Sequence, residues 1–328
     1  MVNVPKSGIS RALGLAAVVV IIVAVAGATY FRSQNVAPTT TPTTRSIAST
    51  STSIASTTTA SASTTQVPQR DYNGSLEVGG LTRSYLVHLP SSYDGKRATP
   101  LLLMFHALNN YDYYIMQHDL NNISEKRGFI VVYPNGYNAS WAAGGAFPAD
   151  VKGVDDVAFV STLIDKMARE LNIDTSKVYA TGFSNGGMFS LRLACELSDK
   201  VAGVAAVGAT IAEKVSATCS PKKLIPILII HGTADNTVPL AGIAGFLSFP
   251  DTIGKWVGIN GCPTSPVVTY APHRDLNGGK VREEVYSPCR DNAKVAFYSV
   301  EGLHHEWPVA KFNDISSEGI WDFFHGAV

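Results

Sequence analysis

The sequence predicts an α/β domain with a mostly parallel central sheet and helices on both faces, and two observations support this prediction. From about Arg70 onward, short β-branched or aliphatic runs alternate with helix-like segments over roughly 260 residues, which is typical of one α/β domain. The middle runs are also continuously apolar, as expected for strands that are buried on both faces of a parallel sheet. The sequence contains no internal repeat.

Short β-branched or aliphatic runs are expected to form the strands. Residues 155–172 are expected to form an amphipathic helix, because apolar side chains recur with a period of 3.6 residues and Asp155 or Asp156 is positioned as its N-cap. The remaining expected elements are strands over residues 84–90, 100–106, 129–134, 177–182, 201–208, 225–232 and 293–300, and helices over 185–197, 251–259 and 317–326.

An uncharged apolar segment, residues 12–31, follows Lys6 and Arg11 near the N-terminus. Its length of about 20 residues is sufficient to span a bilayer, and the positive flank predicts a cytoplasmic N-terminus. Alternatively, the small residues 26–28 form a signal-peptidase site after a shorter apolar core. We favour an uncleaved anchor, because the run is longer than the usual signal-peptide core of about 7 to 15 residues. Either interpretation predicts export of everything that follows.

The next segment, residues 38–66, is about two thirds Ser and Thr with almost no large apolar side chain. Such a segment cannot bury enough surface to offset its ordering entropy, and its composition resembles an O-glycosylated stalk. We therefore divide the chain into a cytoplasmic stub with an anchor or signal peptide (1–37), a disordered stalk (38–69) and one folded domain (70–328).

Composition limits the kinds of partner that the chain can have. It carries 26 basic and 26 acidic residues, for a formal net charge of zero, and no long charged block follows the N-terminus. The chain therefore lacks the net positive charge that is typical of nucleic-acid-binding proteins, and a neutral substrate is favoured. We expect neither a cofactor nor a metal ion, membrane contact through the N-terminal segment only, and a monomer.

Four cysteines lie in the expected folded domain, and none belongs to a C-x-x-C pair. In an exported protein an even number of cysteines indicates disulfides, whereas the ligand spacing of a zinc site is missing. Three pairings are open. We favour Cys195 with Cys219 and Cys262 with Cys289, because each closes a loop of roughly 25 residues without crossing the candidate catalytic segments.

The strongest candidate nucleophile is Ser184, in the pattern G-x-S-x-G formed with Gly182 and Gly186. The pattern alone is weak in a chain this rich in Gly and Ser. Here, however, it follows an apolar strand and opens an amphipathic helix, which is the strand-turn-helix context of a nucleophile elbow. The flanking glycines permit the sharp turn, and the helix N-terminus supplies N–H groups near developing negative charge. A phosphate-binding loop is disfavoured, because the Walker lysine is absent.

A serine nucleophile needs a base and an orienting carboxylate, and both can follow it in the chain. Asp235 lies a few residues past the apolar run "ILIIHG", and His304 and His305 lie just past the strand expected to end near Val300. All of these groups are therefore expected beyond strand carboxyl ends, the edge at which sites gather in open α/β sheets. The competing interpretation is that Asp235 is a turn residue and that both histidines are structural.

These motifs resemble those of a known family, the α/β-hydrolase esterases of the polyhydroxybutyrate depolymerase, feruloyl esterase and acetylxylan esterase group. The resemblance covers nearly all of residues 71–328 and is strongest at "VDDVAFV", "VYATGFSNGGM", "LACEL", "HGTADNTVP" and "HHEWP". It implies an α/β-hydrolase fold with Ser184 as nucleophile, Asp235 as acid and His305 as base, the histidine two residues before Trp307.

The resemblance also implies an oxyanion hole and a substrate surface. The backbone N–H of Asn185 is the expected first oxyanion donor, and that of Leu108 is the second. The family usually has His-Gly at the second site, whereas this chain has His106-Ala107, which puts the geometry of that loop in question. Trp141 is expected either to line the substrate pocket or to pack in the core, and Trp307 to contact substrate. His106 and His231 are expected to be structural.

The resulting hypothesis is a serine esterase that acts on a short-chain, feruloyl or acetyl-polysaccharide, or hydroxyalkanoate ester. Two alternatives remain open at this stage: a catalytically silent binding or adhesion module on the same fold, and a serine peptidase. Asn73, Asn122 and Asn138 begin N-x-S sequons, which a host that glycosylates exported chains can modify.

Overall fold

The computed structural model describes residues 70–110, 113–272, 280–308 and 317–325. The expected anchor or signal peptide in residues 1–37 and the expected stalk in residues 38–69 lie outside these ranges. Inside them, no helix combines the length and the apolar character that crossing a bilayer requires.

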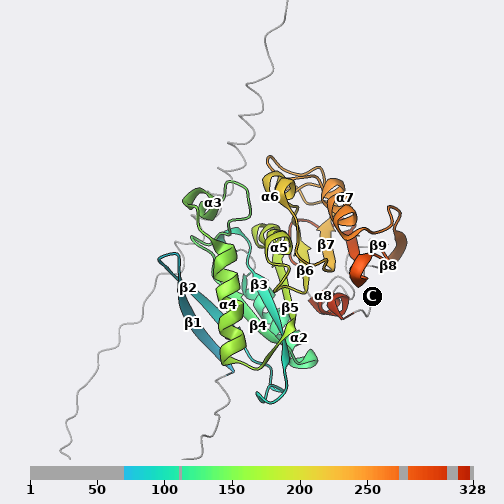
Figure 1. The fold of residues 1–328 in the computed structure, drawn as a ribbon. Coiled ribbons are helices and arrows are strands. Elements are labelled where there is room, and N and C mark those ends of the chain that lie inside the picture. The colour runs from blue at the N-terminus through green and yellow to red at the C-terminus, as the bar shows by residue number, and fades with distance from the viewer. Residues whose placement is uncertain (1–69, 111–112, 273–279, 309–316, 326–328) are drawn as a thin grey trace, which may run out of the picture. The chain divides into compact units, whose positions relative to one another are not determined.

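The described part of the chain forms a 10-stranded sheet in the order β1-β2-β4-β3-β5-β6-β7-β10-β9-β8 (Figure 1). The six central strands, which are β4, β3, β5, β6, β7 and β10 in sheet order, pair in parallel. Two further strands extend the sheet at each side by antiparallel pairing, β2 and β1 at one side and β9 and β8 at the other. The strands are β1 (Asp71–Val78), β2 (Leu81–His88), β3 (Thr99–Phe105), β4 (Ile130–Pro134), β5 (Ile173–Phe183), β6 (Gly203–Val207), β7 (Ile227–Gly232), β8 (Val267–Pro272), β9 (Lys280–Tyr286) and β10 (Val295–Val300).

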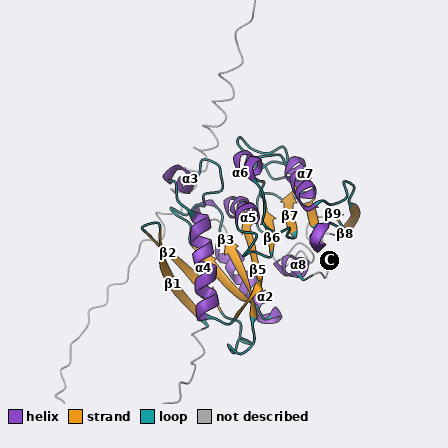
Figure 2. Cartoon of the chain, in the orientation of Figure 1, coloured by secondary structure: helices purple, strands orange, loops and turns teal. Residues whose placement is uncertain are grey.

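Helices cover both faces of the sheet, as predicted (Figure 2). One apolar layer packs α4, α5 and α7 against the sheet, and the other packs α2 and α8 against the opposite face. Central strands supply alternate side chains to the two layers; Leu101 and Leu103 enter the first, for example, and Leu102 enters the second. The helices are α2 (Tyr113–Arg127), α3 (Pro148–Lys152), α4 (Asp156–Glu170), α5 (Asn185–Glu196), α6 (Glu213–Thr218), α7 (Phe249–Asn260) and α8 (Ser317–Phe324), with 3₁₀ turns η1 (Leu108–Asn110) and η2 (Arg290–Asn292).

The continuous apolar runs predict the parallel strands well, because those strands are buried on both faces. Each of the seven expected strands has a counterpart within a few residues of its expected bounds, and so do the four expected helices. The N-cap of α4 is Asp155, whose carboxylate accepts the N–H of Ala158. Asp156 instead turns into the protein and forms a buried ion pair with Arg83 at 2.7 Å.

The strand order positions the candidate site. Strands β3 and β5 are paired neighbours in the sheet. The strand that follows β3 in the chain, β4, lies on the far side of β3, and the strand that follows β5, β6, lies on the far side of β5, so the strand order runs in opposite directions from this pair. The carboxyl ends of β3 and β5 therefore border the topological switch point, where ligands bind in open α/β sheets. Phe105, which ends β3, pairs with Gly182, so the segment after β3 emerges beside Ser184.

Candidate active site

Ser184 joins β5 to α5 in a conformation that few residues other than glycine adopt. Its φ of 52° and ψ of −120° turn the chain sharply between the strand and the helix. Such a conformation costs of order 1–3 kcal/mol and persists only where the surrounding structure holds it. Here the N–H of Ser184 donates to the carbonyl of Val207 at 2.9 Å, on the neighbouring strand β6.

The turn leaves the Ser184 side chain partly exposed. All residues from Val178 to Leu191 except Ser184 are buried. The Ser184 hydroxyl makes no capping hydrogen bond to helix α5. The strained turn therefore presents one hydroxyl at the carboxyl edge of an otherwise buried strand and helix.

The glycines on either side of Ser184 are required by close packing. A Cβ atom on Gly182 would lie 2.5 Å from the carbonyl carbon of Gly186, and a Cβ on Gly186 would lie 2.1 Å from the carbonyl oxygen of Phe105. Real Cβ atoms do not approach backbone atoms so closely. The pattern G-x-S-x-G thus brings the first turn of α5 against the end of β3.

Asp235 and His305 come from loops at the carboxyl ends of β7 and β10, which are parallel neighbours. The two loops pack tightly, since a Cβ on Gly232 would lie 2.1 Å from the carbonyl oxygen of Leu303 and the N–H of Ala234 donates to that oxygen at 3.0 Å. His305 Nδ1 lies 2.6 Å from Asp235 Oδ2. The structure therefore joins the expected acid and base.

The Asp235 carboxylate is buried but well supplied with donors. Burial by itself would raise its pKa, but the hydrogen bond from His305, the charge of that imidazole when protonated and the backbone N–H of Val238 outweigh burial, so that the pKa lies below its usual value. Asp235 Oδ1 also accepts the N–H groups of Thr237 at 2.9 Å and Val238 at 2.8 Å. The side chain is thus held as a carboxylate in one orientation.

The side chains of the two adjacent histidines have different surroundings. The His305 ring lies 4.7 Å from the Phe183 ring, centroid to centroid, and 3.3 Å from the position that a Cβ on Gly208 would occupy. Gly208 follows Val207, the residue whose carbonyl binds the Ser184 backbone. His305 therefore lies beside the elbow. His304 is exposed, and its Nδ1 lies 3.0 Å from the carbonyl oxygen of Ala234.

The expected oxyanion donors lie on the two segments that Gly186 brings into contact. Asn185 is the first residue of α5, and Leu108 is the first residue of η1, two residues beyond His106. Ala107, which stands where the family usually has glycine, is buried with 2% exposure. Its methyl group is therefore accommodated in this loop.

Comparison with known proteins shows the family of this chain. The model of the phospholipase/carboxylesterase family matches residues 149–249, which include Ser184 and Asp235. The chain is 32% identical over 260 residues to the putative esterase NocK of Nocardia uniformis subsp. tsuyamanensis, covering 72% of this chain and 73% of that protein. It belongs to the α/β-hydrolase esterases of the feruloyl and acetylxylan esterase group.

Other relatives in this esterase family differ in length. The esterase chain is 28% identical to probable feruloyl esterase C of Aspergillus terreus over 78% of its own length and 87% of that protein. It is also 28% identical to a bifunctional acetylxylan esterase/xylanase of Neocallimastix patriciarum, of which it spans only 33%, over 74% of its own length. The solved acetyl xylan esterase of Aspergillus awamori shares the fold, with a TM-score of 0.52, 17% identity, and coverage of 74% of this chain and 94% of the other.

Trp141 and Trp307, the expected substrate contacts, are both buried in this esterase, which favours the core alternative for Trp141 and gives Trp307 a core position as well. Trp141 is 0% exposed and stacks on Phe189 at 5.2 Å between ring centroids. Trp307 is 3% exposed, and its indole N–H donates to Ser317 Oγ at 3.3 Å. Core residues cover both indole rings, so neither ring is accessible to a substrate in this structure.

The esterase contains the two disulfides of the favoured pairing. Cys195, near the end of α5, is bonded to Cys219, and Cys262 is bonded to Cys289. The first bond ties the helix that begins after Ser184 to the segment after α6. Among the described residues, no group of three or more His, Cys, Asp or Glu side chains could hold a metal ion.

The structure also contains a surface hollow. It is lined by α3, the first turns of α4 and the last turns of α5, and includes Asp150, Asp155, Arg192 and Glu196. Arg192 and Glu196 pair with each other at 2.8 Å, and Asp155 caps α4. These three side chains therefore already make contacts that serve the fold.

Proposed function

We propose that this chain is an exported serine esterase that cleaves carboxylic esters through an acyl-enzyme, with Ser184 as nucleophile, His305 as base and Asp235 as the orienting acid. The observation that carries the proposal is the 2.6 Å contact between Asp235 and His305 beside an elbow that presents the Ser184 hydroxyl. This combination of a nucleophile, a base and an orienting carboxylate is the arrangement that acyl transfer requires.

In the first half-reaction, His305 Nε2 takes the proton of the Ser184 hydroxyl while Oγ attacks the ester carbonyl carbon. The carbonyl oxygen becomes an oxyanion, to which the N–H groups of Asn185 and Leu108 donate. The imidazolium returns the proton to the leaving alcohol as the bond between the carbonyl carbon and the alcohol oxygen breaks. In the second half-reaction, water attacks the acyl-enzyme with His305 again as base, and the acid is released.

The proposed substrates are short-chain esters, feruloyl or acetyl esters of polysaccharides, and hydroxyalkanoate esters. The names of the relatives support the polysaccharide esters, since they include acetylxylan and feruloyl esterases. The zero net charge supports a neutral substrate over a strongly charged one.

Three observations support a location outside the cytoplasm. The two disulfides are typical of oxidising compartments. The apolar segment at residues 12–31 and the Ser/Thr-rich segment at 38–66 precede the folded domain, as in a protein displayed on a stalk. We propose that the enzyme acts at the cell surface or in the medium as a monomer.

The test uses the purified full-length chain with p-nitrophenyl acetate, p-nitrophenyl butyrate and methyl ferulate. We expect hydrolysis that Ser184→Ala abolishes without loss of the folded state, together with covalent labelling of Ser184 by a fluorophosphonate. The proposal fails if Ser184→Ala keeps more than a small fraction of wild-type kcat/KM. Cleavage of peptides in preference to esters would instead favour a peptidase, and a folded chain that hydrolyses none of these substrates and is not labelled would favour a binding module.

A further inference from the structure

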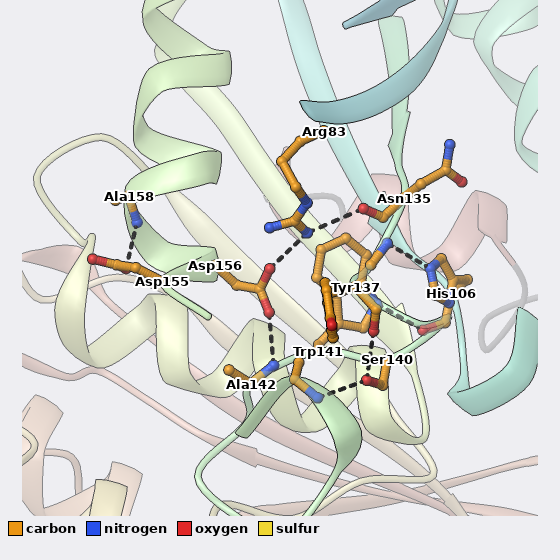
Figure 3. A network of polar contacts seen from close by, with 12 residues as sticks. Arg83, His106, Asn135, Tyr137, Ser140, Trp141, Ala142, Asp155, Asp156 and Ala158 are labelled. Atoms are coloured by element: carbon orange, nitrogen blue, oxygen red, sulfur yellow. Dashed lines mark hydrogen bonds and ion pairs between the residues drawn. The ribbon is translucent and has the colours of Figure 1, made fainter. Parts of the chain in front are cut away.

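His106 follows β3 directly, and its imidazole is fully buried at 0% exposure. Both ring nitrogens are nevertheless in contact with backbone groups. Nδ1 lies 2.8 Å from the carbonyl oxygen of Ala107. Nε2 lies 2.9 Å from the backbone nitrogen of Gly136, a contact drawn as a dashed line at His106 in Figure 3. A histidine that only filled space would not need two such partners.

These partners determine where the His106 proton resides. A carbonyl oxygen can only accept a hydrogen bond, so Nδ1 must carry the hydrogen that it donates to Ala107. A backbone N–H can only donate, so Nε2 must be the unprotonated nitrogen that accepts from Gly136. Burial lowers the pKa of His106 to about 4, which keeps the ring in this neutral form near pH 7.

The hydrogen bond from His106 to the Ala107 carbonyl also affects the orientation of the next backbone group, the N–H of Leu108. The Ala107 carbonyl and the Leu108 N–H belong to the same planar trans peptide and point in opposite directions. A donor that holds the carbonyl therefore also sets the direction of the Leu108 N–H. We propose that His106 is a positioning residue, whose Nδ1–H aims the Leu108 N–H at the oxyanion; this rests on the serine esterase function proposed above.

A second segment, residues 135–142, links this peptide to the other oxyanion donor. The Trp141 indole N–H donates to the carbonyl oxygen of His106 at 3.0 Å. The buried Asn185 side chain accepts the backbone N–H of Trp141 at 2.7 Å and donates to the Trp141 carbonyl at 3.1 Å. Since the backbone N–H of Asn185 is the first proposed donor, one segment fixes both donors relative to each other.

Buried charges hold the two ends of that segment in turn. Arg83 donates to the carbonyl oxygen of Asn135 at 3.1 Å, and Asp156 accepts the N–H of Ala142 at 2.8 Å. Arg83 and Asp156 also pair with each other at 2.7 Å, with 4% and 0% side-chain exposure (Figure 3). The support of the oxyanion hole is thus a continuous set of contacts from a buried ion pair to the Ala107 peptide.

Two substitutions at His106 separate its two hydrogen bonds. The amide of asparagine reaches the position of Nδ1, so His106→Asn keeps a donor to Ala107 and loses the acceptor for Gly136. The amide of glutamine reaches the position of Nε2, so His106→Gln keeps the acceptor and loses the donor. The two variants are therefore matched controls for each other, because only one of them removes the side-chain donor to the Ala107 carbonyl, whereas the backbone N–H of Asn110, 3.1 Å from the same oxygen, is present in both.

We expect His106→Gln to lower kcat roughly 10²-fold with little change in KM, because a misdirected oxyanion donor weakens binding of the transition state alone. His106→Asn should remain within about tenfold of wild type. The affinity of an alkyl boronate, which forms a tetrahedral adduct with Ser184, should fall in His106→Gln by about the same factor as kcat. Equal losses in both variants, or a larger loss in His106→Asn, would overturn the proposal.

A measurement on the unmodified full-length protein covers the case in which a variant fails to fold. The ¹⁵N chemical shifts of His106 at pH 7 should show a protonated Nδ1 and an unprotonated Nε2, and the opposite tautomer or an imidazolium would contradict the proposal. Ser184→Ala in the same assays keeps the two questions apart. If hydrolysis survives in Ser184→Ala, the proposed function fails and the role of His106 fails with it, whereas if Ser184→Ala is inactive the role of His106 fails only through its own variants and tautomer.

Discussion

Asp235 Oδ2 and His305 Nδ1 lie 2.6 Å apart, although 70 residues separate them in the sequence. The contact exists because β7 and β10 are parallel neighbours whose carboxyl ends carry the two loops. His305 then lies beside Phe183 and Gly208, next to the elbow. This relationship leads to predictions about each histidine and about the acid.

Replacing His305 by alanine should lower kcat/KM by several orders of magnitude, because Ser184 would attack as a weakly nucleophilic hydroxyl. His304→Ala is the matched control, since His304 is exposed and its side chain lies at hydrogen-bond distance from the Ala234 carbonyl and not from Asp235. It should cost far less. Steady-state kinetics on one small ester decide the matter: a large loss at 304 with near-normal activity at 305 would reverse the assignment, and near-normal activity in both would remove the triad.

Asp235→Asn should lower kcat by roughly 10³- to 10⁴-fold while the protein stays folded. The N–H groups of Thr237 and Val238 require an acceptor, so the amide oxygen should take the place of Oδ1 and the NH₂ group should face His305. Nδ1 would then have to accept, and the proton would move to Nε2, where it blocks transfer from Ser184. Asp165→Asn, at an exposed pair with Lys200, is the control and should leave kcat unchanged. An active Asp235→Asn enzyme would exclude the orienting role.

The folded enzyme should lose stability as the pH falls from about 6.5 toward 4. Burial lowers the pKa values of His106 and His231 to about 4, whereas the unfolded chain binds these protons near pH 6.5. The unfolded state therefore binds more protons in this window, and acid favours it by up to about 1.4 kcal/mol per pH unit for each histidine.

Urea unfolding at pH 7.5 and pH 5.0 measures this difference. We expect a loss of about 2 to 4 kcal/mol at the lower pH, and a smaller loss in His231→Gln, which removes one of the two groups. Equal unfolding free energies of the wild type at both pH values would show that these histidines titrate normally in the folded state.

The two disulfides should each stabilise the fold by about 3 to 4 kcal/mol, which is the loop-closure value for loops of this length. The bonded cysteines are 24 and 27 residues apart. The double variant Cys195→Ser/Cys219→Ser should therefore unfold at a lower urea concentration, with the Cys262–Cys289 pair as the matched comparison. Non-reducing peptide mapping of the wild type checks the bonds themselves, and four free thiols would contradict both the pairing and the exported location.

The sequence by itself predicted the parts of the fold whose burial is complete. Parallel strands with helices on both faces are apolar along their whole length, so the strands β3, β4, β6 and β7 can be predicted from their continuous apolar runs. The edge strands β1, β8 and β9 were missed, because they are partly or fully exposed and tolerate polar residues. Helix α2 was missed for a similar reason: among its described side chains, the buried apolar ones are Met116, Leu120 and Ile123.

The candidate chemical groups could also be predicted from the chain, because the order of Ser184, Asp235 and the His304-His305 pair and their places after strands are properties of the sequence, whereas the choice of His305 came from the family resemblance. Tertiary structure alone decided what each group touches. The sequence left Asp156 as a possible cap, but Arg83, 73 residues earlier, makes it half of a buried ion pair. The sequence also left two roles open for Trp141, in the core or in the substrate pocket. In the structure its ring stacks on Phe189 and its indole N–H donates to the His106 carbonyl, which places it in the core. His106 was expected to be structural, yet its two bonds reach Ala107 and Gly136. Burial and hydrogen bonding depend on neighbours distant in sequence, and local pattern carries no information about those neighbours.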